Sequence, residues 1–364
     1  MWLVIIVSFI AILLSFLSKF KGRARFFDIS FIVVTLFAVI HYDYGTDYMT
    51  YYDLWEDFRG MDIKDLLENF YGQTKWTEPG WMLLNAIFGF KNGFFVMVAL
   101  LNIIQNFIYY KLIKDYVPRN WYWLAMFLYL IGDNLYLVNF SMMRQGFTVA
   151  LFVAAAMLMN KRKYVPAFAL VFLSTTIHLS SVICFPFLIL YFLPLKNSKT
   201  IGVAFLVMAL VFTTSFSLMA DMLKMITSME SLGKYGGQRE VTDHVGGGYV
   251  ILHIPNLLVL YALITNKYYK DDNEKYLVAL SFCDIFIMPL IFLAGGMAGR
   301  LGIYFLAFRV FSIPTLCDRN KKIGAMLALF MVLITLYGYY QFFNAPGYIR
   351  SYGGDFHTIF SALE

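Results

Sequence analysis

Long apolar runs, separated by short polar connections, follow one another from the first residues of the chain. They cover residues 2–17, 27–40, 81–110, 120–131, 140–159, 165–177, 182–195, 201–219, 249–265, 276–293, 301–316 and 323–340. A membrane-spanning helix needs roughly 20 predominantly apolar residues. The pattern therefore predicts an all-α polytopic membrane protein with about 10–12 transmembrane helices.

Two parts of this pattern do not fit single spans. The run 81–110 exceeds one span and is interrupted by Lys91-Asn92-Gly93. It predicts a short shallow or re-entrant piece from Pro79 to about Phe90, followed by a full helix. The runs 165–177 and 182–195 are short, and His178 lies between them. They form either a hairpin of tilted helices that meet at His178 or one long bent helix.

The composition agrees with a membrane protein. Hydrophobic residues make up 60% of the chain and charged residues 14%, whereas soluble domains are about 45–50% apolar and about 25% charged. We therefore expect a single transmembrane domain over residues 1–364, without a separate soluble catalytic domain. The three cysteines, Cys184, Cys283 and Cys317, lie in or beside apolar runs. Their spacing argues against a disulfide framework and against a zinc site.

Basic residues divide the connections into two sets. The loops 18–26, 111–119, 160–163, 196–199, 267–275 and 317–322 hold 18 Lys and Arg against five acids, and the other set, with the tail from 341, holds eight against sixteen. The excess of Lys and Arg predicts that the first set is cytoplasmic, with both termini and the loops 41–79 and 220–248 outside. The first run has no basic residues before it, so we expect an anchor and not a cleaved signal.

The first outer loop, 41–79, opens with a stretch rich in Tyr and Asp over residues 41–51. An acidic amphipathic stretch follows over 54–70. It predicts an interfacial helix that lies flat on the membrane. The alternative is a solvated loop helix without chemistry.

Three further polar residues converge on the predicted outer face. Glu78 lies at or just before a helix start, where a carboxylate is either a cap or a catalytic group. Arg144 lies a turn or more inside a helix that opens at Asn139, and it needs a cavity or a partner unless it snorkels to the headgroups. His178 lies at the outer end of its helix, as a catalyst or as a packing residue.

The later outer segments add two arginines. Arg239 follows Gly236 and Gly237, and it either reaches a substrate phosphate or is a solvated loop charge. Arg300 follows a glycine-rich break, and Tyr304 lies one helical turn later on the same side. Guanidinium groups at the outer ends of different helices suit an anionic substrate with phosphate oxygens. The 19 Met and 37 Phe residues either line a groove for a lipid tail or simply contact lipid and neighbouring helices.

At these residues the sequence resembles the EpsG family of bacterial exopolysaccharide polymerases, which are related to the Wzy-type O-antigen polymerases. The matching pieces are Gly45-Thr46-Asp47-Tyr48 with Tyr51, Glu78-Pro79-Gly80 with Trp81, Met143-Arg144-Gln145, His178 with Ser180, and Arg300 with Tyr304. Their order runs through most of the chain. His41 stands where the family pattern usually has an arginine.

The resemblance implies a GT-C-like glycosyltransferase in the bacterial inner (plasma) membrane, with its active site outside and without a metal or other cofactor. The enzyme would move a growing glycan from undecaprenyl pyrophosphate onto a sugar hydroxyl of an incoming lipid-linked repeat unit. A chain-length regulator and a flippase are the expected protein partners.

The residue roles follow from that reaction. Arg144 and Arg300 would neutralise the pyrophosphate leaving group. The base candidates are His178, Glu78 and Asp47, and we prefer the histidine because imidazole exchanges protons near neutral pH. The residues expected to bind substrate are Arg144, Arg300, Gln145, Tyr48, Tyr51, Tyr304 and Arg239.

Two other classes of membrane protein are rivals. A flippase for lipid-linked oligosaccharides would also have about twelve helices and a basic cavity, but alternating access usually needs two related halves and a midplane site. The sequence shows no repeat, and its polar groups gather at one face. A membrane acyltransferase that decorates glycans would take its donor from the cytoplasm, where the loops are short and hold no histidine.

Asp284 and Arg309 lie inside apolar runs and away from the candidate site. An unpaired charge there costs several kcal/mol. Their runs are consecutive and are joined at the outer face, and both residues lie at similar depth. The sequence therefore predicts an ion pair between antiparallel neighbours that locks two helices and does not contact substrate.

Overall fold

The computed structural model describes residues 2–62, 64–65, 78–132, 135–193, 254–265, 270–286, 296–343 and 356–363. The predicted run 201–219 and the loop 220–248, with Arg239, lie outside the described residues. The longer elements are α1 (Trp2–Leu17), α2 (Arg25–Val39), α3 (Tyr48–Phe58), α5 (Pro79–Ile87), α6 (Gly93–Tyr116), α9 (Met143–Asn160), α10 (Tyr164–Ile177), α16 (Ile254–Thr265), α17 (Asp272–Phe282), α19 (Gly296–Leu306), α20 (Arg309–Arg319) and α21 (Lys321–Phe343).

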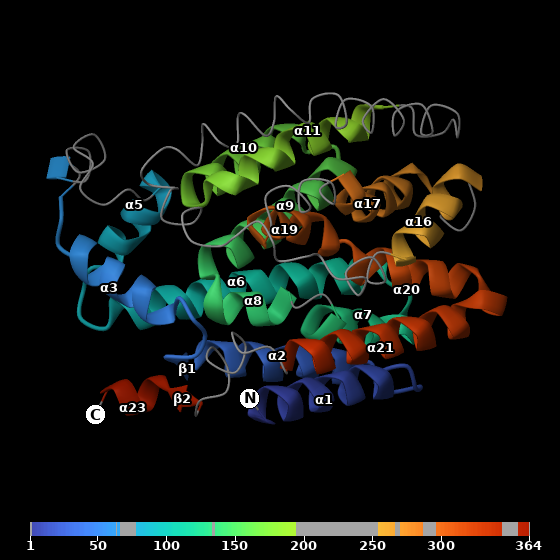
Figure 1. The fold of residues 1–364 in the computed structure, drawn as a ribbon, viewed down its shortest axis with the longest axis horizontal. Coiled ribbons are helices and arrows are strands. Elements are labelled where there is room, and N and C mark those ends of the chain that lie inside the picture. Colours follow the sequence, from blue (N-terminus) through green and yellow to red (C-terminus); the bar gives the residue numbers. More distant parts are fainter. Residues whose placement is uncertain are drawn as a thin grey trace.

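Shorter elements connect them. They are β1 (His41–Tyr42), η1 (Arg119–Trp121), α7 (Tyr122–Phe127), the π-helical turn η2 (Leu128–Gly132), α8 (Leu135–Ser141), η3 (Leu179–Ile183), α11 (Cys184–Ile189), η4 (Leu190–Phe192), η5 (Cys283–Phe286), β2 (His357–Thr358) and α23 (Ile359–Leu363). The two strands pair antiparallel, with His41 opposite Thr358. They tie the chain that follows α2 to a segment near the C-terminus (Figure 1).

The described helices confirm an all-α polytopic membrane protein. In the part of the chain that the structure describes, three segments are long and apolar enough to cross a membrane: Gly93–Tyr116, Arg119–Ser141 and Met143–Asn160. The number rises to four if the bent pair of α19 and α20 is one span. The shorter apolar helices Leu3–Leu17, Tyr164–Ile177, Leu179–Phe192 and Gly324–Tyr337 follow other predicted runs. Figure 1 shows most of the long helices lying roughly side by side along one axis of the molecule.

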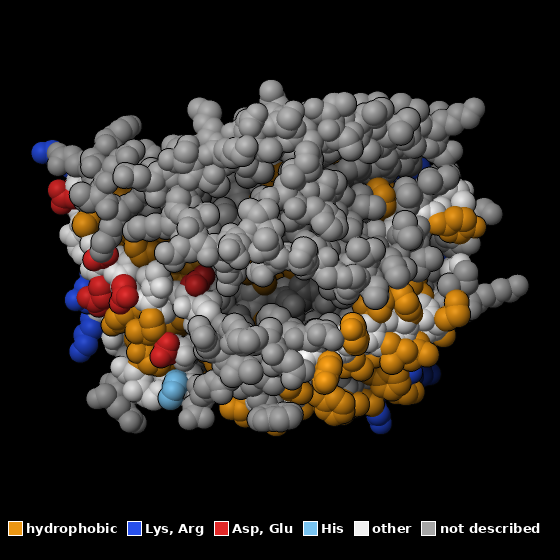
Figure 2. Space-filling model, viewed as in Figure 1, with side chains coloured by type: hydrophobic (Ala, Val, Ile, Leu, Met, Phe, Trp, Pro, Cys, Tyr) orange, Lys and Arg blue, Asp and Glu red, His pale blue; other side chains and the backbone are white. Residues whose placement is uncertain are grey.

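Aromatic packing fills the core between α2, α6 and α7. Phe27 and Tyr122 have ring centroids 4.2 Å apart, and Tyr109 and Tyr129 are 4.4 Å apart. Such pairs contribute about 0.5–1.5 kcal/mol each beyond the buried area. On the outside, α1, α2, α6 and α21 carry large exposed apolar side chains, for example Phe9, 65% exposed, and Phe107, 58% exposed. Figure 2 shows an apolar surface over α1, α2 and α21, which suits contact with lipid.

The predicted break in the run 81–110 is confirmed. α5 ends at Ile87, α6 begins at Gly93, and Asn92 between them is left-handed with φ +63°. A Cβ at Gly93 would collide with the Phe88 carbonyl oxygen. Only a residue without a side chain allows this close approach, so the glycine permits α6 to start directly after the turn.

The hairpin at His178 is also confirmed, and the long bent helix is not observed. His178 is extended, with φ −151° and ψ 110°, between α10 and η3. The Tyr164 ring at the start of α10 lies 5.0 Å from the Phe192 ring at the end of η4. Phe168 and Phe185 stack at 6.3 Å about midway along. The two arms are therefore antiparallel and meet at His178.

Two predicted boundaries were wrong. The helix that carries Arg144 does not open at Asn139, because Met142 breaks it with φ −104° and ψ 58° and α9 starts at Met143. The run 301–316 is two helices that meet at 41° between Leu306 and Arg309. In the first outer loop, α3 runs over Tyr48–Phe58 with Tyr48, Tyr51, Trp55 and Phe58 on its buried face, and Gly60 follows with φ +80°. Residues 66–70 lie outside the described residues, so the interfacial helix over 54–70 stays a prediction.

Several connections predicted to be cytoplasmic meet at one end of the bundle. Arg119 donates to the Ser18 carbonyl at 2.7 Å, Trp121 donates to Asp318 at 3.2 Å, and Asn160 donates to the Asn273 carbonyl at 3.3 Å. Arg319 also contacts Glu274 at 3.4 Å, so the loops 18–26, 111–119, 160–163, 267–275 and 317–322 are linked. Glu78, Arg144 and His178 lie at the opposite end. Which end faces the cytoplasm stays a prediction.

Candidate active site

Glu78 stands immediately before α5, with the extended backbone (φ −67°, ψ 140°) that is typical of a cap position. Its carboxylate does not cap α5. Instead it forms an ion pair with the guanidinium of Arg144 and accepts the Leu179 backbone N–H at 3.1 Å. Pro79 starts α5 without an N–H of its own. Of the two interpretations of Glu78, the cap is therefore excluded.

Arg144 is the second residue of α9, directly after the break at Met142. Its side chain is 17% exposed and that of Glu78 is 12% exposed, so the pair is largely shielded from solvent. The guanidinium lies 5.6 Å from the Tyr51 ring centre and 6.0 Å from that of Trp81. These two rings contact each other edge to face at 5.5 Å. Arg144 is therefore held by a carboxylate and two aromatic rings and does not snorkel.

His178 adds an imidazole to the same carboxylate. Its Nδ1 lies 3.4 Å from Glu78 Oε1, and its side chain is 25% exposed. Because His178 ends α10 in an extended conformation, the chain turns there and brings the Leu179 N–H to the same oxygen. We call Glu78, Arg144 and His178 the charged cluster.

The charged cluster changes the acidity of Glu78. Burial alone raises the pKa of the carboxyl, but the nearby imidazole of His178, the charge of Arg144 and the Leu179 N–H together lower that pKa to about 2. Groups that stabilise a carboxylate lower its pKa in this way. Glu78 is consequently ionised throughout the neutral range and is a poor base there.

α19 joins the charged cluster through a second set of polar contacts. Gln145 donates to the Arg300 carbonyl at 2.6 Å. The Tyr304 hydroxyl lies 3.0 Å from the Thr148 hydroxyl and 3.0 Å from that of Ser180. Because Gln145 is adjacent to Arg144 and Ser180 is two residues from His178, these bonds hold α19 against the charged cluster. The Arg300 side chain is exposed at that junction.

The chain was compared with models of known protein families. The model of the EpsG family matches residues 24–352, nearly the whole chain. The chain belongs to the EpsG family. This is a family of polysaccharide polymerases, so the expected family is confirmed. No curated protein matches the chain, and no solved structure matches it. The expected GT-C-like architecture therefore stays a prediction.

The EpsG-type residues do not all meet in one place. Glu78, Arg144, Gln145, His178, Arg300, Tyr304 and Tyr51 lie in or beside the charged cluster. Tyr48 does not, since it is fully buried and its hydroxyl donates to the His41 carbonyl at 3.4 Å. Asp47 lies at the N-cap of α3, and no described contact joins it to the charged cluster.

The first EpsG motif has a packing role around the end of α8. A Cβ at Gly45, where φ is +107°, would lie 2.5 Å from the Phe140 carbonyl oxygen. Thr46 and Ser141 bring their hydroxyl oxygens to 2.5 Å. His41 is fully buried and its Nδ1 contacts the Ala38 carbonyl at 2.5 Å. These residues of the motif therefore pack around the end of α8, next to the start of α9, and do not contact the charged cluster in the described structure.

Sequence reasoning missed Thr148 and the Leu179 N–H. Thr148 lies four residues after Arg144, so helical spacing places the two side chains on the same face of α9 and was a usable signal. The backbone N–H of Leu179 had no signal, because its direction depends on the turn at His178. Among the described residues, no three His, Cys, Asp or Glu side chains gather to hold a metal ion.

Proposed function

We propose that this protein polymerises an exopolysaccharide outside the plasma membrane. It would transfer a growing glycan from undecaprenyl pyrophosphate to a sugar hydroxyl of an incoming lipid-linked repeat unit, without a metal or other cofactor. The observation that carries this proposal is the charged cluster, in which an arginine, a carboxylate and an imidazole from three segments meet at one end of the helix bundle. Membership of the EpsG family supports it.

In this reaction His178 is the base. Its Nδ1 lies 3.4 Å from Glu78 Oε1, so the carboxylate favours the tautomer with its proton on Nδ1, which leaves Nε2 as the acceptor. Nε2 takes the proton of the acceptor hydroxyl while that oxygen bonds to the anomeric carbon. The bond from this carbon to the pyrophosphate oxygen breaks, and its electron pair leaves with the lipid carrier.

Glu78 then has a supporting role and not that of the base. Its lowered pKa, about 2, keeps it ionised, so it stabilises the imidazolium that forms when His178 accepts a proton. It also fixes the position of Arg144. A carboxylate that orients a histidine in this way raises the share of the productive tautomer.

Arg144 and Arg300 receive the leaving group. A pyrophosphate gains negative charge on its bridging oxygen as the glycosidic bond breaks, and guanidinium groups already in place stabilise that charge. Arg144 is held by Glu78, and the backbone of Arg300 is held by Gln145. The guanidinium of Arg144 is therefore positioned before substrate binds, while the exposed side chain of Arg300 extends from a fixed backbone. Arg239 would add a further contact to phosphate. Asp47 and Tyr51 would bind the acceptor sugar. Tyr48 would contribute only through its packing in α3.

The partners follow from the reaction. The substrates are two undecaprenyl-pyrophosphate-linked oligosaccharides in the outer leaflet. A flippase must deliver them to that leaflet, and a chain-length regulator would set how many units are joined.

The test is synthesis by purified protein in lipid. Wild-type protein is incubated with lipid-pyrophosphate-linked repeat units and no nucleotide sugar, and the products are separated by size. We expect a ladder of glycans that grow by one repeat unit. Unchanged repeat units moved across a vesicle membrane would indicate a flippase instead, and acylated repeat units of unchanged length would indicate an acyltransferase.

A further inference from the structure

A pocket lies at the same end of the molecule as the charged cluster. It has a volume of about 390 Å³ and is lined by Tyr52, Trp55, Arg59, Gly60, Gly89, Lys91, Asn92 and Phe95. These residues come from α3 and from the turn between α5 and α6. No residue of the charged cluster lines it. We call it the α3–α6 pocket.

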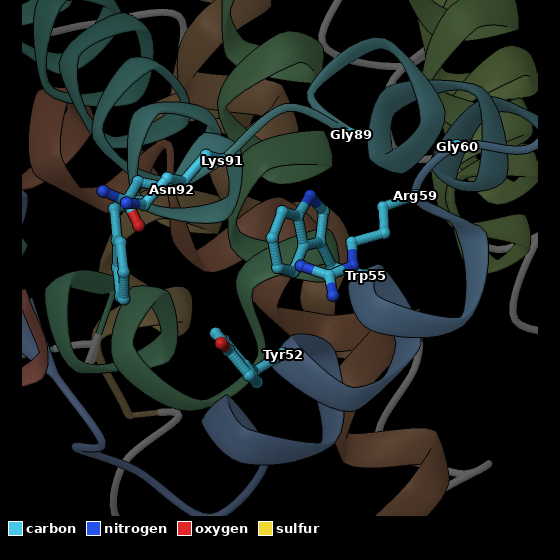
Figure 3. Close-up of a pocket in the computed structure, with 8 residues that line it drawn as sticks. Tyr52, Trp55, Arg59, Gly60, Gly89, Lys91 and Asn92 are labelled. Atoms are coloured by element: carbon cyan, nitrogen blue, oxygen red, sulfur yellow. The ribbon is translucent and has the colours of Figure 1, made fainter.

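Figure 3 shows how its side chains are arranged. The Arg59 guanidinium lies against the Trp55 indole, 5.1 Å from the ring centre, while Lys91 and Asn92 lie on the other side of the opening. Trp55 is 2% exposed and donates its Nε1–H to the Phe88 carbonyl at 2.8 Å, so it forms a fixed floor. Tyr52 and Phe95, with ring centres 6.3 Å apart, form an aromatic wall.

The charges of the α3–α6 pocket suit an anion. Arg59 pairs with Glu56 at 2.7 Å through one terminal nitrogen, and its side chain remains 46% exposed. A guanidinium carries five N–H donors, so one carboxylate does not exhaust it. Lys91 is exposed. The N-terminus of the long helix α6 lies beside it and adds a partial positive charge.

The surroundings of the pocket suit the head of a lipid. Lys91 and Asn92 immediately precede α6, a membrane-spanning candidate, so they lie where the chain enters the bilayer. Close to them in the chain, the end of α5 and the turn before α6 expose apolar side chains, among them Ile87, 59% exposed, and Phe90, 52% exposed. A phosphate at Arg59 and Lys91 would thus have its hydrocarbon chain beside an apolar surface.

The α3–α6 pocket and the charged cluster share two elements. On α3, Tyr51 faces Arg144 while its neighbour Tyr52 lines the pocket. α5 begins after Glu78 and ends before Gly89, and its nine residues correspond to about 13 Å at roughly 1.5 Å per residue. A Cβ at Gly80 would collide with the end of α10, 2.8 Å from the Thr176 carbonyl oxygen. α5 therefore bridges from the end of α10 to the start of α6, at one end of the bundle.

We propose that the α3–α6 pocket binds the pyrophosphate head of the lipid-linked acceptor. This inference rests on the proposed function, which requires two lipid-linked substrates at once. The donor pyrophosphate lies at Arg144 and Arg300, and the acceptor pyrophosphate lies at Arg59 and Lys91. The acceptor oligosaccharide spans the length of α5 between them, so this length selects repeat units whose reacting hydroxyl reaches His178.

The test first measures binding. Purified protein in phosphatidylcholine nanodiscs is titrated with a polyprenyl pyrophosphate that carries no sugar, and bound copies are counted by native mass spectrometry. We expect two copies on the wild type. The double variant Arg59→Gln, Lys91→Gln should bind the second copy at least about tenfold more weakly. The matched control Lys161→Gln, Lys163→Gln removes the same charge at the opposite end and should bind both.

Competition identifies the source of the phosphate. Phosphatidylglycerol at equal concentration should leave both copies bound, and so should a soluble glycan that carries carboxylates. Equal displacement by phosphatidylglycerol would show an ordinary headgroup site, and displacement by the glycan would show a sugar site. Either result, or two copies on the double variant at wild-type affinity, overturns the proposal.

Polymer synthesis then tests the acceptor role. In the ladder assay the double variant should raise KM for the repeat unit about tenfold or more with kcat retained. A lower kcat with unchanged KM overturns the acceptor role. Wild-type protein that binds two copies yet makes no polymer refutes the proposed function and, with it, the acceptor role. Wild-type protein that makes polymer but whose double variant loses nothing refutes the pocket alone.

Discussion

The ion pair between Asp284 and Arg309 allows a quantitative prediction, because both charged side chains are buried. Arg309 Nη2 lies 2.9 Å from Asp284 Oδ2, and the two side chains are 4% and 1% exposed. Asn256 bridges them, since its amide donates to Asp284 at 2.5 Å and its oxygen accepts from Arg309 at 2.9 Å. The pairing expected from the sequence is therefore confirmed.

Removing one partner leaves the other charge buried. We expect Asp284→Ala and Arg309→Ala each to lower the free energy of unfolding by about 3–5 kcal/mol, the usual cost of breaking a buried ion pair. The double variant should lose less than the sum of the two, because it leaves no uncompensated charge. Such coupling energies are about 0.5–3 kcal/mol between contacting residues.

The assay is a double-mutant cycle on purified protein, with folded protein measured by size-exclusion chromatography across a denaturing detergent series. Arg319→Ala is the matched control, since Arg319 contacts Glu274 at 3.4 Å with its own side chain 38% exposed. It should cost less than about 1 kcal/mol. Strict additivity of the Asp284 and Arg309 variants would refute the reasoning.

The same ion pair bears on the position of α19 at the candidate active site. Arg309 is the first residue of α20, directly after the 41° bend that separates it from α19. α19 carries Arg300 and Tyr304. The buried ion pair thus holds the start of α20 in place. Because α19 is joined to α20 at the bend, the pair also sets the orientation of α19 relative to α9.

The remaining predictions concern orientation and roles. In a cysteine-free background, Arg162→Cys should resist an impermeant thiol reagent in intact cells, and its modification would refute the predicted orientation. Arg144→Lys with Arg300→Lys should greatly reduce polymer yield at equal expression, since a point charge does not replace a bidentate fork, and normal yield would count against the pyrophosphate site. The His178→Ala variant should lose most of its polymerase turnover. If His178→Ala keeps its turnover and Glu78→Gln loses it, Glu78 is the base instead. The pKa of Glu78 falls from 4.5 to about 2 on folding. Ionised Glu78 therefore contributes its full stabilisation of the folded protein above pH 4.5, and this contribution disappears as the pH falls toward 2. An acid-unfolding series in which Glu78→Gln keeps the wild-type pH dependence would contradict this.

Much of the fold could be predicted because lipid imposes a simple rule on sequence. The predicted run 2–17 has the same bounds as α1. Lys91-Asn92-Gly93 marked a true break, since a charge and a glycine interrupt an apolar run there. The pairing of Asp284 with Arg309 followed from the cost of a buried charge. Each of these signals depends on neighbouring residues in the sequence or on the cost of placing a charge in the membrane.

The breaks inside apolar sequence could not be predicted in the same way. Met142 separates α8 from α9 without a glycine or proline, and the bend between Leu306 and Arg309 lies in a run that reads as continuous. Tertiary packing decides these positions. The hydroxyl contact of Thr46 with Ser141 and the close approach of Gly45 to Phe140 lie beside the break at Met142.

The residues of the candidate active site could be singled out from the sequence, but their contacts could not. Glu78, Arg144 and His178 stood out because each is costly or unusual at a membrane helix end. That a single carboxylate would contact the other two depends on the turn at His178 and on the start of α9 after Met142. Tyr48 carries the same motif signal as Tyr51, yet the rotation of α3 places it against His41.

The central claim is that the charged cluster transfers glycan from a lipid pyrophosphate. Its most direct test counts the polyprenyl pyrophosphate released per glycosidic bond formed by purified protein. We expect one released carrier for each bond in the wild type and in the Lys161→Gln, Lys163→Gln control, with both products lost together in His178→Ala and Arg144→Lys. Polymer that forms without release of the carrier, or release at the wild-type rate by both cluster variants, would contradict the account.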